Sequence, residues 1–302
     1  MRLGVFIRAA RLPFLTGSLM PVALVAALAV WRGAWGGFWY FFITMLGVAG
    51  LHTGGNLIND YYDSFGSDPI NRFATPFSGG SRVIQTGELD APAVRNLAYA
   101  SLGLGVVCGL ILIYHGRPWV ALLGLFGLAA AYLYSASPVQ LMSKGLGELT
   151  IFLAFGPVLS LGAYYAITGR VSPAGFYLGL PLGFLITAIL WINEFPDLEA
   201  DTAAAKEHLV ARLGLKRSRM IYAGLMLAPF LSLPLLMELF DFPGHLFAGL
   251  VALPLAVNAV RQAWVTPPTD EDFVAVQALT IKTHFLTGVS LTLAFLYAAW
   301  WA

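Results

Sequence analysis

Two neighbouring stretches decide how this chain folds: "FWYFFITMLGVAGL", residues 38–51, and "NLINDYYDSFGSD", residues 56–68. The first has no charged residue, and the second brings Asp60, Asp63 and Asp68 together within a short span. A long apolar run of this kind is typical of a membrane-spanning helix. Ionisable residues at a membrane edge are costly and usually functional. The pair of stretches therefore predicts a spanning helix that ends in a functional site.

The composition of the whole chain predicts an all-α, polytopic membrane protein. Of its 302 residues, 58% are hydrophobic and 11% are charged, and the mean hydropathy is +0.75. Soluble domains have about 45–50% apolar and about 25% charged residues. Because a spanning helix needs about 20 apolar residues, we expect nine spanning helices in a single transmembrane domain, residues 1–302. They are 13–32, 38–58, 96–115, 118–137, 148–168, 173–192, 220–238, 245–263 and 280–301.

Charged residues gather on one side of this expected topology. Nine helices place the N-terminus and the loops after the second, fourth, sixth and eighth helices on one face. Of the 17 Lys and Arg, only Arg32, Arg117 and Arg170 lie on the other face. The positive-inside rule makes the rich face cytoplasmic. We therefore expect a multi-pass protein of the cell (inner or plasma) membrane whose site faces the cytoplasm, although longer, more solvated loops would show the same bias.

The N-terminus and the cysteine content give two simpler expectations. The N-terminal stretch "MRLGVFIRAARLPF" is basic but is followed by no small-residue cleavage site, so we expect the first helix to be retained. The single cysteine, Cys108, excludes an internal disulfide framework and a cysteine metal site.

A second acidic cluster matches the first. In "WINEFPDLEAD", residues 191–201, Asn193, Asp197 and Asp201 are spaced i, i+4 and i+8, which places them along one helix face. The long predicted loops 59–94 and 193–219 follow the second and sixth helices. The equivalent positions of the clusters indicate a weak internal repeat, about 1–147 and 148–263, with a ninth helix added.

The residue types in these clusters favour a magnesium site. Asp and Asn provide only oxygen ligands, which suit Mg²⁺ rather than zinc. Mg²⁺ usually binds a few carboxylates together with substrate phosphates. The clusters therefore predict a ligand that carries phosphate, bound by nearby basic residues. The alternative is a set of solvated acids at helix ends. The basic candidates are Arg72, Arg82, Lys144 and Lys206.

The paired motifs resemble those of UbiA-type intramembrane prenyltransferases. Within that family they are most similar to the 1,4-dihydroxy-2-naphthoate polyprenyltransferases of menaquinone synthesis. The resemblance extends over nearly the whole chain. It rests on "NDYYD" (59–63), "FSGGSRVIQTG" (77–87), "YSASP" (134–138), "KGLGEL" (144–149) and "NEFPDLEAD" (193–201). Two positions depart from the family pattern: Ser67, followed by Asp68, replaces the last Asp of the first motif, and Ala205 replaces a Gly before Lys206.

The resemblance implies a UbiA-like bundle with a cytoplasmic cap over the active site. It also implies Mg²⁺-dependent transfer of a polyprenyl group from its diphosphate to an aromatic ring. With 1,4-dihydroxy-2-naphthoate the ring also loses CO₂ and gives demethylmenaquinol. The expected partners are polyprenyl diphosphate, an aromatic acceptor and the lipid bilayer, and no nucleic acid is expected.

The resemblance and the residue chemistry together assign roles to individual side chains. The catalytic aspartates are Asp60, Asp63, Asp197 and Asp201. The metal set adds Asn59, Asp68 and Asn193 to these four. The diphosphate set is Asn56, Arg72, Arg82, Lys144 and Lys206. Tyr62, Tyr134 and Tyr164 are the candidates for a carbocation or acceptor pocket, since aromatic faces attract cations.

Other functions and acceptors stay open from the sequence. A transporter also has internal repeats and intramembrane acids, but its acids are expected near the bilayer midplane. A purely structural membrane subunit is a further alternative. Within the prenyltransferases, 4-hydroxybenzoate, another naphthoate or an isoprenoid-lipid precursor such as a glycerol phosphate are possible acceptors, and the sequence does not indicate the prenyl chain length.

Overall fold

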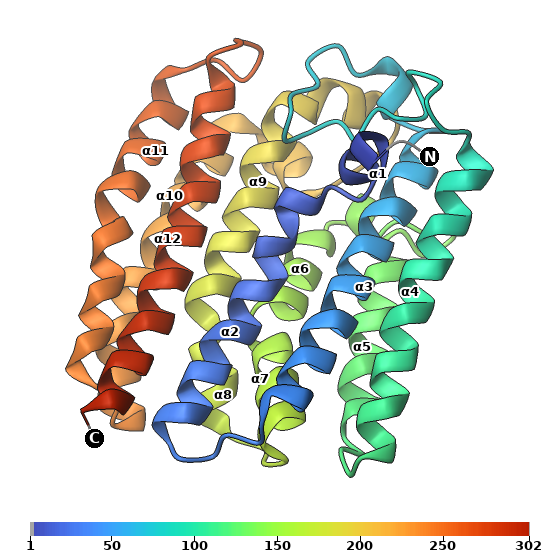
Figure 1. Ribbon diagram of the computed structural model, residues 1–302. Coiled ribbons are helices and arrows are strands. Elements are labelled where there is room, and N and C mark those ends of the chain that lie inside the picture. The colour runs from blue at the N-terminus through green and yellow to red at the C-terminus, as the bar shows by residue number, and fades with distance from the viewer. Residues whose placement is uncertain (1–2, 302) are drawn as a thin grey trace.

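The structure is a computed structural model that describes residues 3–301, and it is an elongated bundle of helices (Figure 1). The part described contains no β-strand. The α-helices are α1 (Leu3–Ala9), α2 (Thr16–Trp31), α3 (Phe38–Asp63), α4 (Ala91–Tyr114), α5 (Val120–Leu133), α6 (Gly147–Phe155), α7 (Pro157–Thr168), α8 (Pro173–Leu178), α9 (Leu180–Ala203), α10 (Leu209–Phe240), α11 (Leu253–Val265) and α12 (Phe273–Trp300). The 3₁₀ helices are η1 (Leu12–Leu15), η2 (Asp68–Ile70), η3 (Leu141–Lys144) and η4 (Gly244–Ala252).

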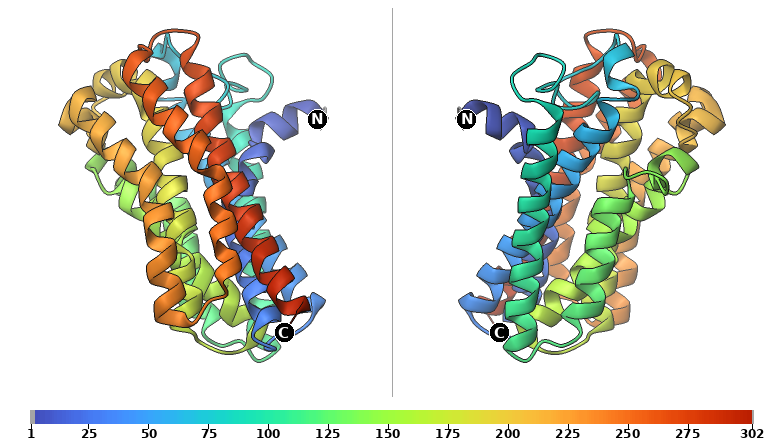
Figure 2. Two further views of the ribbon diagram at one scale, coloured as in Figure 1. Left: turned by 90° about the vertical axis from the view of Figure 1, so that its left-hand side faces the viewer. Right: turned by 90° about the vertical axis from the view of Figure 1, so that its right-hand side faces the viewer.

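The bundle is that of a multi-pass membrane protein, as the sequence predicts. Within residues 3–301, eight helical stretches are long and apolar enough to cross a membrane, and α5 is a shorter apolar helix. Each of the nine predicted segments coincides with one of these nine. Figure 2 shows the N-terminus and the C-terminus at opposite ends of the bundle. Helix α1 projects sideways at the end where the N-terminus lies.

The predicted long loop 193–219 is wrong, because most of it is helical. Helix α9 continues to Ala203 and α10 begins at Leu209, so only residues 204–208 connect them. The non-helical backbone of Gly214 kinks α10 soon after it begins. Likewise α3 continues through Asp63, and the first connection is shorter than the predicted 59–94. Both acidic motifs therefore lie on the last turns of long helices rather than in flexible loops.

Two of the predicted spanning segments are each divided at a glycine. Gly156 separates α6 from α7, and Gly179 separates α8 from α9. A Cβ atom at Gly156 would lie 2.6 Å from Cα of Gly183, and one at Gly179 would lie 2.5 Å from the carbonyl oxygen of Gly156. The two broken segments therefore cross at backbone contact, a packing mode that small residues permit inside membranes.

Helices α3 and α4 lie side by side along the bundle (Figure 1). A Cβ at Gly50 of α3 would lie 2.8 Å from the Ser101 carbonyl oxygen and 3.0 Å from the Gly105 nitrogen, both on α4. Gly47 and Gly54, one turn away on either side, also lie close against α4. This glycine face positions the helix that carries the first acidic motif.

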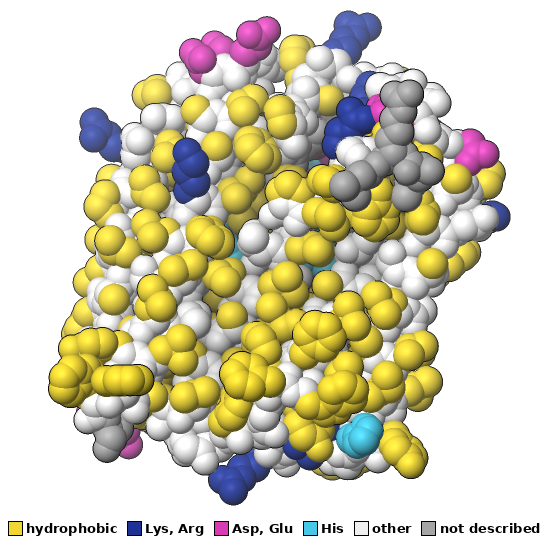
Figure 3. Space-filling model, in the orientation of Figure 1, with side chains coloured by type: hydrophobic (Ala, Val, Ile, Leu, Met, Phe, Trp, Pro, Cys, Tyr) yellow, Lys and Arg dark blue, Asp and Glu magenta, His cyan; other side chains and the backbone are white. Residues whose placement is uncertain are grey.

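The surface of the bundle is banded. Figure 3 shows hydrophobic side chains over the middle of the molecule and charged side chains concentrated at the end where the N-terminus lies. The opposite end carries exposed aromatic side chains, as expected for an aromatic belt at a membrane interface. These are Phe38, Trp39, Tyr114, Trp119, Trp300 and Trp301.

The glycine contact between α3 and α4 gives a stability prediction. Gly50→Ala is expected to lower the stability by about 1–3 kcal/mol relative to Gly103→Ala, because overpacking forces α3 and α4 apart. Gly103 is the matched control: it lies on α4, and a Cβ there meets nothing within 4 Å. Both changes gain the same helix propensity. Unfolding midpoints in detergent, followed by circular dichroism, measure the difference. Equal midpoints would contradict the close contact.

Candidate active site

A cavity of about 290 Å³ lies inside the bundle where α3 and α9 end. One part of its wall is polar and contains residues of both acidic motifs. The other part is apolar and is formed mainly by α3, α5, α6 and α9, with Leu51, Ala130, Phe155 and Ile189 as examples. The connection 64–90 lies over the polar end (Figure 1), and its residues Asn71, Gly79 and Ser81 bond to the two motifs.

The first motif projects from the last two turns of α3. Asn56, Asn59 and Asp63 line the cavity. Nδ2 of Asn59 donates to Asp63 Oδ2 at 2.8 Å and lies 3.2 Å from Ser135 Oγ, so this amide orients the carboxylate. Asp60 is 2% exposed and is not part of the cavity wall. Its carboxylate accepts the backbone N–H of Ser81 at 3.2 Å and pairs with an arginine from the N-terminal segment.

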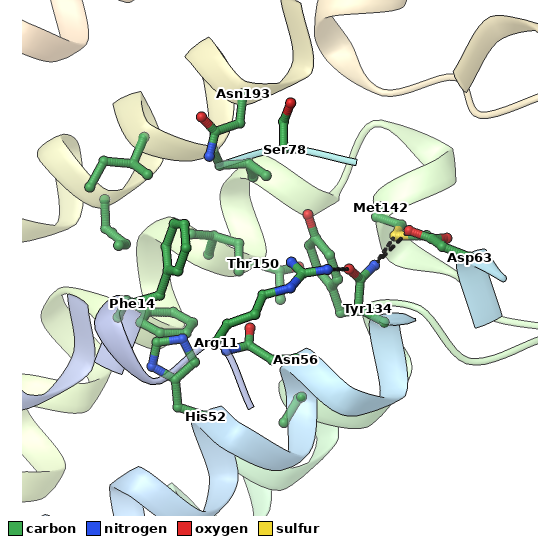
Figure 4. Close-up of a pocket in the computed structure, with 18 of the residues that line it drawn as sticks. Arg11, Phe14, His52, Asn56, Asp63, Ser78, Tyr134, Met142, Thr150 and Asn193 are labelled. Carbon is green, nitrogen blue, oxygen red and sulfur yellow. Dashed lines mark hydrogen bonds between the residues drawn. The ribbon is translucent and has the colours of Figure 1, made fainter. Parts of the chain in front are cut away.

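That arginine is Arg11. From the sequence alone, it is only one of many Lys and Arg residues on the predicted cytoplasmic side. It sits between α1 and η1 with φ at +48°, and this turn aims its side chain into the bundle. The guanidinium donates to Asp60 and, at 3.2 Å, to Asn59 Oδ1, and it lines the cavity (Figure 4). The only hint of this role in the sequence is that Arg11 is a basic residue directly before the first spanning segment. The topology of a membrane protein explains such a residue without any role in a site.

The second motif lies on the last turns of α9, across the cavity from the first. Asp197 Oδ1 accepts from Asn71 Nδ2 at 2.7 Å, and its Oδ2 accepts from the backbone N–H of Gly79 at 3.0 Å. Asn193 Oδ1 accepts from Gln277 of α12 at 3.0 Å. The sequence does not predict Asn71 and Gln277 as site residues, because their partners are far away along the chain.

Lys206 joins the two motifs. Its Nζ lies 2.9 Å from Asp63 Oδ1 and 3.2 Å from Asp201 Oδ1. Burial alone lowers the pKa of Lys206, but the two carboxylates outweigh it and raise that pKa above its usual value. Lys206 is therefore a fixed positive charge between the motifs.

Asp68 lies beneath the loop that contains Gly79 and Gly80. It is 3% exposed, and burial, followed by the charges of Asp63 and Asp60, raises its pKa to about 8. Gly80 has φ at +78°, and a Cβ there would lie 2.4 Å from Asp68 Oδ2. The double glycine of "FSGGSR" is therefore required for the loop to close over this carboxylate.

The wall has more carboxylates than Arg and Lys side chains, which suits a divalent cation. It carries the carboxylates of Asp63, Asp68, Glu194, Asp197 and Asp201. Among the Arg and Lys residues described, only Arg11 and Lys206 line it. Crowded carboxylates at low dielectric repel one another unless cations lie between them. Carboxylate and amide oxygens from α3, α9 and η2 thus form a suitable donor set for Mg²⁺.

A second group of buried polar residues supports the second motif. Glu148, Glu194 and His208 have side-chain atoms within 4.8 Å of one another. Glu148 accepts the backbone N–H of Leu209 at 2.6 Å, and His208 Nδ1 accepts that of Ala211 at 3.3 Å, so both cap the start of α10. His208 Nε2 lies 3.5 Å from Asp201 Oδ2. These contacts fix the short connection that carries Lys206.

Several predicted site residues lie outside the cavity wall. Arg72 borders a smaller hollow, Arg82 donates to the Asp68 carbonyl, and Lys144 donates to the Pro138 carbonyl at 3.1 Å on the surface. Tyr62 turns away from Asp63 because neighbouring residues on a helix point about 100° apart. Tyr164 is 3% exposed in the core between α7 and α8. Of the three tyrosines, Tyr134 lines the cavity (Figure 4).

The family of the chain follows from its sequence. The model of the UbiA prenyltransferase family matches residues 19–281. The chain belongs to this family. The 1,4-dihydroxy-2-naphthoate octaprenyltransferase of Mycobacterium tuberculosis is 33% identical over 257 residues, 84% of each chain. The family match confirms the predicted class of enzyme, a prenyltransferase.

Solved UbiA structures have the same fold as this UbiA-family protein. A UbiA homolog from Aeropyrum pernix superimposes with a TM-score of 0.69 at 15% identity, covering 92% of this chain and 97% of the other. A UbiA homolog from Archaeoglobus fulgidus bound to DMAPP and Mg²⁺ gives 0.63 at 17% identity, covering 94% and 99%. The fold predicted from the resemblance is confirmed.

The buried ion pair between Arg11 and Asp60 gives a stability prediction for this UbiA-family protein. Arg11→Gln is expected to cost about 3 kcal/mol, because it leaves the Asp60 carboxylate buried without its partner. The double change Arg11→Gln with Asp60→Asn is expected to recover most of that loss. Thermal unfolding in detergent measures both.

Arg8 provides the control for this pair. It pairs with Glu88 at the surface, where its side chain is 57% exposed. Arg8→Gln is expected to change the stability by less than about 1 kcal/mol. Equal losses for Arg8→Gln and Arg11→Gln would show that burial of the Asp60 pair has no energetic effect.

Proposed function

We propose that the protein transfers a polyprenyl group from a polyprenyl diphosphate to 1,4-dihydroxy-2-naphthoate, with Mg²⁺ and with loss of CO₂. The observation that carries the proposal is the cavity itself. Acidic motifs from α3 and α9, distant in sequence, meet at its polar end, and an apolar chamber continues from them into the bundle. Such a cavity suits a ligand with a charged head and a hydrocarbon tail.

The diphosphate head is proposed to bind between the two motifs. Mg²⁺ held there would act as a Lewis acid on the leaving diphosphate. Asp63, Asp68, Asp197 and Asp201 are proposed as its ligands, with Asn59 and Asn193 as supporting donors. Asp60 has a different proposed role: it orients Arg11 and the Ser81 backbone rather than facing the cavity.

The two cations of the wall complete the diphosphate site. The Arg11 guanidinium presents planar donors that match phosphate oxygens, and Lys206 supplies a point charge. Both are already held by carboxylates or amides, so they are pre-positioned before substrate arrives. Positive charge fixed at the leaving oxygen favours cleavage of the bond between that oxygen and C1 of the prenyl group. Asn56 also reaches this site.

The apolar chamber is proposed to hold the prenyl chain and the allylic cation. Phe14, Phe77, Phe155 and Tyr134 line the cavity, and aromatic faces attract cations. In this proposal, the loop 64–90 over the polar end and the apolar wall keep water away from the cation, which water would otherwise trap as an alcohol.

The identity of the acceptor is proposed from the name of a relative. With this acceptor, the bonds that form and break in the reaction can be written out. The M. tuberculosis relative is named for 1,4-dihydroxy-2-naphthoate. The ring carbon that carries the carboxylate forms a bond to C1 of the prenyl group while the bond from C1 to the diphosphate oxygen breaks. The bond between that ring carbon and the carboxylate carbon then breaks, CO₂ leaves, and the electron pair of this bond restores the aromatic ring.

We also propose the wider setting of this reaction. The end of the bundle that carries the motifs is taken to face the cytoplasm of a cell membrane, because Lys and Arg concentrate there. The two motif helices, α3 and α9, would be equivalent elements of an internal repeat, about 1–147 and 148–263. The two halves and the ninth helix together would form one catalytic domain.

The reaction gives the first test. Purified protein in detergent with radiolabelled geranylgeranyl diphosphate, Mg²⁺ and 1,4-dihydroxy-2-naphthoate is expected to yield a prenylated, decarboxylated naphthol. EDTA is expected to abolish the product. Asp63→Asn and Asp197→Asn are each expected to lower kcat/KM at least about 100-fold, because each removes a charge from the site of the leaving group.

Glu199→Gln is the matched control for these variants. Glu199 lies on α9 between Asp197 and Asp201 but is exposed on the opposite side of the helix. It is expected to keep full activity. Product with 4-hydroxybenzoate alone would overturn the naphthoate acceptor, and activity that survives EDTA and both Asp variants would overturn the mechanism.

Cysteine labelling tests the proposed orientation. The only native cysteine, Cys108, is 2% exposed and is not expected to react. Thr269→Cys places a thiol at the charged end and Val171→Cys places one at the opposite end. A membrane-impermeant maleimide added to intact spheroplasts is expected to label the Val171→Cys variant and to reach the Thr269→Cys variant only after permeabilisation. The reverse pattern would invert the topology.

A further inference from the structure

One polar side chain in the apolar chamber has no part in the proposed diphosphate site. His52 lies on α3 below Asn56 and lines the cavity (Figure 4). Its neighbours in the wall include Val48, Leu51 and Phe155. At 1.5 Å per residue, His52 lies about 10 Å deeper along α3 than Asn59. The imidazole is therefore below the diphosphate head, at the depth where the rest of a ligand must lie.

The ring of His52 has two close contacts, one at Nδ1 and one with an aromatic ring. Nδ1 lies 2.8 Å from Ser18 Oγ of α2, and the imidazole meets the Phe155 ring edge-on with centroids 4.8 Å apart. An imidazole fixed in this way presents its remaining nitrogen in a defined direction. This rigidity suits a group that positions a ligand.

The hydrogen bonds of Ser18 are compatible with a tautomer of His52 that carries its proton on Nδ1. Ser18 Oγ lies 3.2 Å from the Leu15 carbonyl oxygen, which can only accept. With the single hydroxyl proton of Ser18 in that bond, Oγ accepts from Nδ1–H of His52, and the inference takes this tautomer as its premise. In a neutral imidazole the other nitrogen, Nε2, then keeps its lone pair. This tautomer gives the cavity a hydrogen-bond acceptor within an apolar wall.

We propose that His52 Nε2 accepts a hydrogen bond from a hydroxyl group of the aromatic acceptor. This inference rests on the proposed function, because it assumes an aromatic acceptor in the chamber. A prenyl tail has no donor for Nε2, and a polar atom left against hydrocarbon is costly. A hydroxylated ring satisfies Nε2 and stacks within the aromatic wall. His52 therefore selects hydroxylated acceptors and orients the ring for attack.

The hydrogen bond also affects the nucleophile. A hydroxyl that donates to nitrogen releases electron density into its ring, which makes the ring carbons more nucleophilic. No bond to His52 forms or breaks, and the proton remains on the acceptor oxygen. His52 thus binds the acceptor, whereas the metal site binds the diphosphate. Both serve the same reaction, but His52 is not part of the metal site.

The test compares aromatic acids that differ by one hydroxyl group. Inhibition constants of 1-hydroxy-2-naphthoate and 4-hydroxy-2-naphthoate are compared with the Michaelis constant for the dihydroxylated naphthoate, at saturating geranylgeranyl diphosphate. In the wild type, one of the two analogues is expected to bind about tenfold more weakly, which is the effect of one hydrogen bond. In His52→Phe that tenfold preference is expected to disappear, while the Michaelis constant for geranylgeranyl diphosphate stays within about twofold.

Two further variants separate binding from folding. Ser18→Ala keeps the imidazole but removes the partner of Nδ1–H, and it is expected to reduce the preference a few-fold. Thr53→Val, on the same helix but away from the cavity, is expected to keep it. A merely structural role for His52 would lower the melting temperature and leave the preference unchanged, which would overturn the inference. A raised Michaelis constant for the prenyl diphosphate alone would also overturn it.

The activity of the wild type tests the proposed function independently of the role of His52. If the wild type makes no product with 1,4-dihydroxy-2-naphthoate, the proposed acceptor is wrong. The preference is then measured with 4-hydroxybenzoate against benzoate, and its loss in His52→Phe would still support the role of His52. If the wild type accepts no aromatic ring at all, the proposed function and the proposed role of His52 are both wrong.

Discussion

The functional end of the molecule depends on Lys206, which lies between Asp63 of α3 and Asp201 of α9. These helices come from opposite halves of the chain, and each ends in carboxylates that would repel the other in a low-dielectric interior. A single ammonium group turns that repulsion into attraction. The caps formed by Glu148 and His208 at the start of α10 hold the short connection that delivers it. The position of one side chain thus sets the spacing of two motifs.

Much of this arrangement can be predicted from the sequence. Apolar length identifies spanning helices, and all nine predicted segments are helical, because in a bilayer only a helix satisfies the backbone of a single segment. The spacing of Asn193, Asp197 and Asp201 also predicts their common helix face. The extent of helix α9 is not predictable in the same way. The end of α9 and the start of α10 are rich in charged residues and so have the composition of a loop, which is why the sequence predicts an irregular segment 193–219.

Individual contacts across the site are much harder to predict. Arg11 reaches Asp60 through one left-handed residue, and Asn71 reaches Asp197 from a loop with no repeating pattern. Such contacts depend on where separate elements meet, which periodicity does not report. The same limit explains Tyr62 and Tyr164, which lie near the motifs in sequence or in composition but face other helices. Tertiary packing, not local pattern, decides which side chains share a cavity.

The division of the cavity into a charged end and an apolar chamber has a kinetic consequence. A ligand with a hydrocarbon tail arrives from the lipid phase, so its effective concentration is a mole fraction in the bilayer and not an amount per volume of buffer. A small hydroxylated acid partitions between lipid and water instead. In vesicles, adding inert lipid at a constant amount of prenyl donor would dilute one substrate far more than the other. The lipid content of the membrane would then govern turnover as directly as the supply of either substrate.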